Sequence, residues 1–217
     1  MLSKGLIIFD FDGTLGDTRR NIVRTMQMTI NELQLPSRSE DECSSTIGLP
    51  LAECFRKLFP YIQDELIPRC AETYRRFFNE NLKIIQPVAF PGVVETLSAL
   101  KEQGYMLTIA SSRSRNSLIE LTRDMGITDS ISYLIGADDV EKAKPNPEPV
   151  LKTLTAMCFA PTQTFVVGDM AVDILMGINA GAKTCGVTWG NGSREELEKA
   201  GANYIIDKIE DILDIHF

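Results

Sequence analysis

Six short hydrophobic runs recur along the chain, and polar or turn-forming residues follow each of them. The runs are continuously apolar, without alternation, which is typical of parallel strands covered on both faces. The expected strands are residues 6–9, 106–110, 131–135, 164–167, 184–187 and 204–206. Helical periodicity between them predicts helices at residues 93–103, 117–125, 147–157, 172–180 and 193–200. This alternation predicts an α/β protein with a parallel sheet.

One long interval after the first expected strand breaks the alternation. Residues 17–90 contain no convincing buried strand, and their amphipathic stretches predict helices at residues 21–33, 51–59 and 63–79. Pro87, Pro91 and Gly92 then interrupt regular structure before the next helix. We therefore expect a core of residues 1–16 and 85–217 and an α-helical insertion of residues 17–84. Both connections of the insertion would meet near the end of the first strand, where a lid over a site would be hinged.

The composition excludes several classes of partner. The chain has 217 residues, 44% of them hydrophobic and 24% charged, as in ordinary globular proteins. With 22 Lys and Arg against 30 Asp and Glu, the net charge of -8 disfavours a nucleic-acid partner. No segment approaches the roughly 20 apolar residues of a transmembrane helix, and the first apolar run is too short for a signal peptide. We expect no membrane partner, and either a monomer or a homodimer.

Cysteine and histidine usage limits the possible chemistry. The five cysteines are odd in number, widely spaced and without a CxxC pair, which fits neither a disulfide framework nor a zinc site: Cys43, Cys54, Cys70, Cys158 and Cys185. They favour a reducing, cytoplasmic location. Because His216 is the single histidine, a Ser-His-Asp triad, a Cys-His pair and a His-rich metal site are all disfavoured. Chemistry must then rely on carboxylates, lysine and hydroxyl groups.

The first strand ends in the sequence DFDGTL, residues 10–15. This places Asp10 and Asp12 at the carboxyl end of a parallel strand, where open α/β sheets bind ligands. Two carboxylates before a glycine turn can hold a hard cation and offer one oxygen to an electrophile. For the Asp-x-Asp tripeptide alone, the alternative is a turn that merely ends the strand.

DFDGTL closely resembles the nucleophile motif of the haloacid dehalogenase-like hydrolase superfamily, whose pattern has three further motifs. The second is a Ser or Thr after a strand, and here Ser111 and Ser112 follow residues 106–110. The third is a lysine, and Lys144 in KAKPNPEP matches the Lys-Pro junction of the family better than Lys142 does. Taken alone, the serine is more typical of a helix N-cap, and a lone lysine in a loop is normally solvated.

The fourth motif is a pair of acids after a late strand. Asp169 and Asp173 occur in the form GDxxxD directly after the expected strand at residues 164–167. Taken alone, Asp173 is equally typical of an acid that stabilises a helix N-terminus. All four motifs occur in the expected order, each after an expected strand, and the resemblance covers residues 5–215.

The resemblance implies a Rossmann-like, doubly wound parallel sheet with an inserted α-helical cap domain. The helical insertion resembles the cap of the subgroup of phosphoglycolate phosphatases and β-phosphoglucomutases, and residues 46–51 resemble a glycine-containing cap loop of that subgroup. The implied activity is that of a Mg2+-dependent phosphatase. Its substrate would be a small phosphorylated metabolite of the phosphoglycolate or sugar-phosphate type.

The resemblance also implies roles for the acids. Asp10 would attack phosphorus and form an aspartyl-phosphate, while Asp12 would protonate the departing oxygen and then activate water. Mg2+ would be bound by the carboxylates of Asp10 and Asp169 and by the backbone carbonyl of Asp12. Asp173 lies one helical turn beyond Asp169, so it would either contact the metal or hold Lys144.

Further residues are implied to bind the phosphate. The Ser111 hydroxyl and the Lys144 ammonium would stabilise charge on the phosphoryl oxygens. They would be joined by backbone N–H groups near Phe11, Asp12 and Ser112. Arg113 and Arg115 are candidates for reading a second anionic group of the substrate, and the alternative for both is a solvent-facing arginine at a helix start.

Four alternatives share the fold. A sugar phosphomutase of the β-phosphoglucomutase type uses the same motifs and returns the phosphoryl group to a substrate. A haloacid dehalogenase lacks the acid that Asp12 supplies, and a phosphonate hydrolase needs a cap lysine for which only Lys57 and Lys83 are available. A catalytically inactive metal-binding interaction module would have lost a motif residue, whereas all of them are present.

Overall fold

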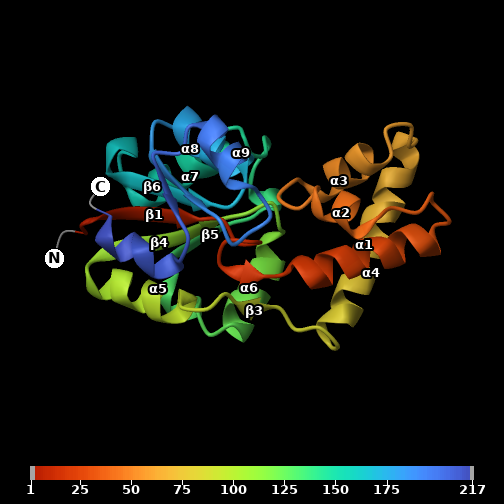
Figure 1. Ribbon diagram of the computed structural model, residues 1–217, viewed down its shortest axis with the longest axis horizontal. Helices are drawn as coiled ribbons and strands as arrows, with labels where there is room; N and C mark the ends of the chain where they lie inside the picture. Colours follow the sequence, from red (N-terminus) through yellow and green to blue (C-terminus); the bar gives the residue numbers. More distant parts are fainter. Residues whose placement is uncertain (1–2, 216–217) are drawn as a thin grey trace.

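Six parallel strands form the central sheet of the computed structural model, which describes residues 3–215 (Figure 1). Their order across the sheet is β5-β4-β1-β6-β7-β8. Their bounds are Gly5–Phe9 (β1), Tyr105–Ala110 (β4), Tyr133–Ile135 (β5), Thr164–Gly168 (β6), Lys183–Val187 (β7) and Tyr204–Ile206 (β8). The doubly wound parallel sheet expected from the sequence is confirmed. Strand β5 starts two residues later than expected, and the Ile131 N–H instead closes the 3-10 turn of Thr128–Ser130 by donating to the Thr128 carbonyl.

Helices cover both faces of the sheet. Alternate residues of a strand point to opposite faces, so Ile7 and Phe9 join one hydrophobic cluster while Leu6 and Ile8 join another. The first cluster includes residues of α5 (Val93–Glu102) and α6 (Arg115–Asp124), and the second includes residues of α7 (Glu148–Met157) and α8 (Ala171–Asn179). Helix α9 (Arg194–Ala200) contacts α8. The 3-10 helices are η1 (Asp64–Leu66), η2 (Thr128–Ser130), η3 (Ala137–Asp139), η4 (Pro161–Gln163) and η5 (Ile209–Asp214).

Four helices lie together beyond the carboxyl ends of the strands (Figure 1). They are α1 (Arg19–Glu32), α2 (Glu40–Ser44), α3 (Leu51–Leu58) and α4 (Ile67–Leu82). They bury a hydrophobic cluster of their own that includes Met26, Phe55 and Cys70. The sequence did not predict α2, which is too short for a hydrophobic period. A capping box starts it, in which Ser39 Oγ accepts from the Glu42 backbone N–H and the Glu42 carboxylate from the Ser39 N–H.

The two connections of the helical insertion are hydrogen-bonded to each other. Strand β2 (Gly16–Asp17) precedes α1, β3 (Val88–Ala89) follows α4, and the two pair antiparallel. This small sheet was not expected, because two residues per strand give no period. It fixes the point at which the insertion leaves and rejoins the core. Within residues 3–215, no helix has the length and apolarity needed to cross a membrane, and His216 lies outside the described residues.

Candidate active site

The chain reverses its progress across the sheet next to β1. From β1 it moves outward through β4 to β5, and it then returns to the other side of β1 to form β6, β7 and β8. Such a switch point opens a crevice at the carboxyl ends of the two central strands. Asp10 follows β1 and donates its backbone N–H to the Val167 carbonyl of β6 at 2.8 Å, and Asp169 follows β6. The first and fourth motifs therefore end on neighbouring strands at this crevice.

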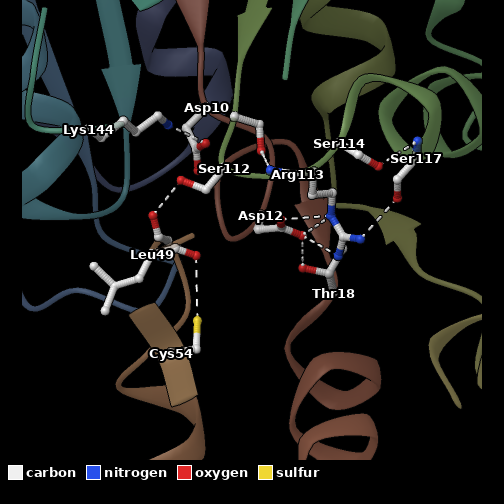
Figure 2. Close-up of polar contacts among 12 residues, drawn as sticks. Asp10, Asp12, Thr18, Leu49, Cys54, Ser112, Arg113, Ser114, Ser117 and Lys144 are labelled. Atoms are coloured by element: carbon white, nitrogen blue, oxygen red, sulfur yellow. Dashed lines mark hydrogen bonds and ion pairs between the residues drawn. The ribbon is translucent and has the colours of Figure 1, made fainter. Parts of the chain in front are cut away.

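Three carboxylates and one ammonium group are buried together there. One oxygen each of Asp10, Asp169 and Asp173 lie within 4.8 Å of one another. Lys144 Nζ donates to Asp10 Oδ1 at 2.6 Å and to Asp173 Oδ1 at 2.7 Å. Figure 2 shows the Lys144 side chain extended towards Asp10. All four residues are at most 6% exposed, so this cluster has little water to screen its charges.

The charges of the cluster are out of balance. Burial raises the pKa of Asp10 well above its ordinary value, and Lys144 only partly opposes this. Burial also raises the pKa of Asp169 to about 7, with a further contribution from the neighbouring Asp173. For Lys144, burial lowers the pKa, but Asp10 and Asp173 raise it by more, so the lysine stays protonated. One ammonium against three carboxylates leaves an electrostatic environment that favours a further cation.

The oxygen atoms of the cluster fit a hard divalent cation. Carboxylate oxygens converging from two strand ends are the ligands that Mg2+ prefers. Asp10 and Asp169 converge as the sequence predicted. Of the two roles left open for Asp173, the structure shows the contact with Lys144, and its carboxylate also lies within the cluster. The carbonyl of Asp12 as a metal ligand stays a prediction.

Asn191 holds Asp169 in place and was not identified from the sequence. Its backbone N–H and its Nδ2 donate to Asp169 Oδ2 at 2.7 Å and 3.0 Å, and the Thr14 hydroxyl donates to Oδ1 at 3.3 Å. The segment is closely packed, because a Cβ at Gly190 would lie 2.3 Å from the Asp169 Cβ. The available signal was a Gly-Asn-Gly sequence shortly after the strand next to β6.

Gly13 permits the tight turn after the two aspartates. Its φ is +87°, and a Cβ there would lie 2.2 Å from Asp169 Oδ2. Both the backbone conformation and the missing side chain are therefore required. The Phe11 side chain between the aspartates is fully buried in the hydrophobic core, which anchors the loop.

The Asp12 side chain lies apart from the carboxylate cluster and is held by two residues, Thr18 and Arg113. The Thr18 hydroxyl donates to Asp12 Oδ1 at 2.6 Å. Arg113 donates through Nε to both carboxylate oxygens, at 2.9 Å and 2.8 Å, and through Nη2 to Oδ1 at 2.8 Å. Figure 2 shows the Asp12 carboxylate directed towards Arg113 and Thr18. Arg113, expected to face a substrate anion, is here paired with a side chain of the protein itself.

The two serines of the second motif have different contacts. Ser111 is 6% exposed, and its Oγ accepts the backbone N–H of Arg113 at 3.3 Å. The Ser112 hydroxyl donates to the Gly48 carbonyl at 2.7 Å. Gly48 belongs to the loop at residues 46–51, and a Cβ there would lie 3.5 Å from Met170 Cγ. This loop of the insertion is therefore seated on the core beside the site.

A cavity of about 550 Å³ lies between the core and the insertion. The core contributes Asp12, Ser112 and Arg113 to its wall, and the insertion contributes Ile47, Tyr74 and Phe78, among other residues. The size suits a small metabolite. Arg115, the second candidate for reading an anion, is not in the wall; its Nη1 lies 3.3 Å from Asp139 Oδ2.

Comparison with known proteins identifies the same family that the sequence motifs resemble. The family described as haloacid dehalogenase-like hydrolase matches residues 7–187. A probable phosphatase, IndB, of Dickeya dadantii is 34% identical over 212 residues, which cover 97% of this chain and 92% of the relative. The pyrophosphatase PpaX of Anoxybacillus flavithermus is also 34% identical over 212 residues, covering 96% of this chain and 95% of the relative.

A solved structure has the same overall fold. It is described as a predicted phosphoglycolate phosphatase of Haemophilus somnus, and it superposes with a TM-score of 0.89 at 25% sequence identity. The superposition covers 99% of this chain and 98% of that one. The similarity therefore includes the helical insertion as well as the sheet.

Proposed function

The chain belongs to the haloacid dehalogenase-like hydrolase family and is a phosphatase, and we propose that it hydrolyses small phosphorylated metabolites with Mg2+ through an aspartyl-phosphate on Asp10. One observation carries the proposal: Asp10, Asp169, Asp173 and Lys144 meet, buried, at the switch point of the sheet. A nucleophilic carboxylate, a cation site and a fixed ammonium are what transfer of an anionic phosphoryl group to an anionic nucleophile requires.

Asp10, Asp169 and the carbonyl of Asp12 would hold the metal. When bound, Mg2+ offsets the repulsion between the Asp10 carboxylate and the phosphate dianion. The Lys144 ammonium would stabilise the same negative charge from its contact with Asp10.

In the first step, a carboxylate oxygen of Asp10 forms a bond to phosphorus while the bond from phosphorus to the leaving oxygen breaks. Asp12 gives its proton to that leaving oxygen, which departs as an alcohol. The product is an aspartyl-phosphate on Asp10. The Ser111 hydroxyl, Lys144 and backbone N–H groups near Phe11 and Ser112 would bind the phosphoryl oxygens during the transfer.

In the second step, Asp12 takes a proton from water as the water oxygen attacks phosphorus. The bond between Asp10 and phosphorus breaks, inorganic phosphate leaves, and Asp10 is again a carboxylate. Asp12 ends the cycle protonated, ready to act as the acid of the next turnover.

Removal of the metal tests the proposed function most directly. We expect the purified protein to release phosphate from p-nitrophenyl phosphate in Mg2+, to lose that activity in excess EDTA, and to regain it when Mg2+ is restored. The physical reason is that buried carboxylates alone repel the substrate dianion. Full activity in the chelator would remove the metal from the proposal.

Replacing Asn191 with alanine is expected to weaken metal binding. The variant removes one of two hydrogen bonds to Asp169 Oδ2 and keeps the backbone one. Loss of a group that orients a metal ligand costs about 10- to 100-fold in affinity. We expect the Mg2+ concentration for half-maximal activity to rise by this factor, with most of the activity recovered at saturating Mg2+. Asn179→Ala is a matched control, since Nδ2 of Asn179 donates to the Pro145 carbonyl and not to an acid of the site.

The proposed substrates are phosphoglycolate, pyrophosphate and sugar phosphates. The first two are named in the descriptions of similar proteins, and the named relatives favour hydrolysis over the phosphomutase alternative. We propose residues 17–84 as a cap domain that closes the cavity over the substrate, supported by the separate hydrophobic cluster of α1–α4. A cytoplasmic location is also proposed, supported by five cysteines that are all free.

A further inference from the structure

Asp12 is placed where its side chain cannot deliver a proton. Both of its oxygens accept N–H groups of Arg113, and Oδ1 accepts the Thr18 hydroxyl as well. A guanidinium has five donors and no acceptor, so a proton on Asp12 would find no partner in Arg113. Figure 2 shows the carboxylate turned towards these donors and away from Asp10. To act as the acid of the first step, Asp12 must leave Arg113.

The Arg113 side chain is confined by its surroundings, so it cannot readily move out into water when Asp12 leaves it. Its side chain is 11% exposed, its guanidinium carbon lies 4.6 Å from the centre of the Phe78 ring, and Nη1 donates to Ser117 Oγ at 3.3 Å. Burial is the largest single influence on the pKa of Arg113 and lowers it, but the charge and hydrogen bonds of Asp12, together with the charges of Tyr74 and Asp10, raise it by more. A buried guanidinium that loses its anionic partner strongly destabilises the folded protein unless another anion takes that place.

The cavity offers the place for such an anion. Arg113, Asp12 and Ser112 lie in its wall on the core side, and Phe78 faces them from α4 of the insertion. Asp12, the proposed acid, lies in the wall of the cavity, so the leaving group that it protonates would lie in this space. A carboxylate or second phosphate on that leaving group would contact the Arg113 guanidinium, whose planar set of N–H donors can form paired hydrogen bonds to either anion.

We propose that Arg113 holds Asp12 away from the reacting phosphate until a second anionic group of the substrate takes over the guanidinium. Arg113 is then a positioning residue that selects substrates with two anionic groups and releases Asp12 to act as the acid of the first step when one is bound. The inference rests on the proposed function, because it needs Asp12 as the acid. It predicts that the second anion accelerates turnover in addition to improving binding.

Two substrates that differ only in that anion test the proposal. Phosphoglycolate carries a carboxylate where 2-hydroxyethyl phosphate carries an uncharged hydroxymethyl group, and both have poor leaving groups that need an acid. For the unmodified enzyme we expect kcat to be at least about 10-fold higher on phosphoglycolate, since general acid catalysis contributes about 10²- to 10⁴-fold. This measurement needs no variant.

Arg113→Gln should remove that difference. We expect kcat/KM on phosphoglycolate to fall by about 10- to 100-fold, the size of a lost charged hydrogen bond, and the two kcat values to become similar. Arg113→Lys keeps the charge without the fork and should restore part of the preference. Arg115→Gln is the matched control: Arg115 pairs with Asp139 outside the cavity wall, so the preference should persist.

The possible outcomes distinguish a failure of the role inferred for Arg113 from a failure of the proposed phosphatase function. Equal kcat values on the two substrates in the unmodified enzyme, or hydrolysis of p-nitrophenyl phosphate but of neither substrate, would overturn the role of Arg113 and leave the phosphatase assignment standing. An equal loss on both substrates in a folded Arg113→Gln protein would do the same, because it indicates a structural role. Absence of Mg2+-dependent hydrolysis of p-nitrophenyl phosphate would instead contradict the proposed function.

Discussion

Asp10→Asn is expected to abolish turnover and to leave the fold intact. The amide has nearly the shape of the carboxylate, but it lacks the charge and the nucleophilic oxygen that attack on phosphorus requires. Loss of a nucleophile has cost about 10⁶-fold in a well-studied hydrolase, so we expect a decrease of at least about 10⁴-fold. Initial rates on p-nitrophenyl phosphate in saturating Mg2+ measure it.

A second Asp→Asn variant nearby and a measurement of helix content serve as controls for Asp10→Asn. Asp17→Asn changes an exposed aspartate on β2 and should keep the rate, and circular dichroism should show the same helix content for both variants. Incubation of the unmodified enzyme with labelled substrate and rapid acid quenching should trap label on Asp10. Substantial phosphatase activity in purified Asp10→Asn would refute the assignment of the nucleophile.

Lys144→Met is expected to damage both activity and stability. Methionine fills much of the volume of the lysine stem but leaves Asp10 and Asp173 without the ammonium that lies 2.6 Å and 2.7 Å from them. Breaking a buried ion pair in this way costs about 3–5 kcal/mol of unfolding free energy. Activity should fall by at least about 10²- to 10³-fold, the usual effect of removing a group that stabilises the transferred charge. Urea denaturation and steady-state rates measure the two effects.

Lys142→Met distinguishes the loss of the buried ammonium group from a change in the conformation of the loop. Lys142 lies two residues before Lys144 and is exposed, so we expect it to change unfolding free energy by less than about 0.5 kcal/mol and activity little. If the two variants behaved alike, the loop conformation and not the buried ammonium would explain the loss. A stable but inactive Lys144→Met would mean that the carboxylate cluster tolerates its own charge.

The insertion is connected to the site by more than the loop at residues 46–51. Thr18 at the start of α1 donates to Asp12, and Phe78 of α4 packs on Arg113. The side chain proposed as the acid therefore contacts the insertion on one side and the core on the other. We expect any movement of α1 relative to the core to change the position of Asp12 directly.

Much of the fold followed from the sequence because its signals are local. Continuous apolar runs identified strands buried on both faces, and each run ended in a polar motif. Since parallel strands share one carboxyl edge, motifs at their ends had to gather there. Asp10, Asp169, Asp173 and Lys144 do so. The two strands and the α-helix that were missed, β2, β3 and α2, have two to five residues each and carry no period.

The partner of each site residue depended on the tertiary structure. Asp12 and Arg113 are 101 residues apart, and nothing in either neighbourhood specifies that they pair. Asn191 reaches Asp169 only because β7 lies beside β6. The sequence by itself determined which chemical groups lie at the ends of the strands, because short local patterns of residues indicate which segments are buried strands and where each strand ends. The order of the strands and the return of the insertion decided which of those groups touch, because such contacts join segments that share no local pattern.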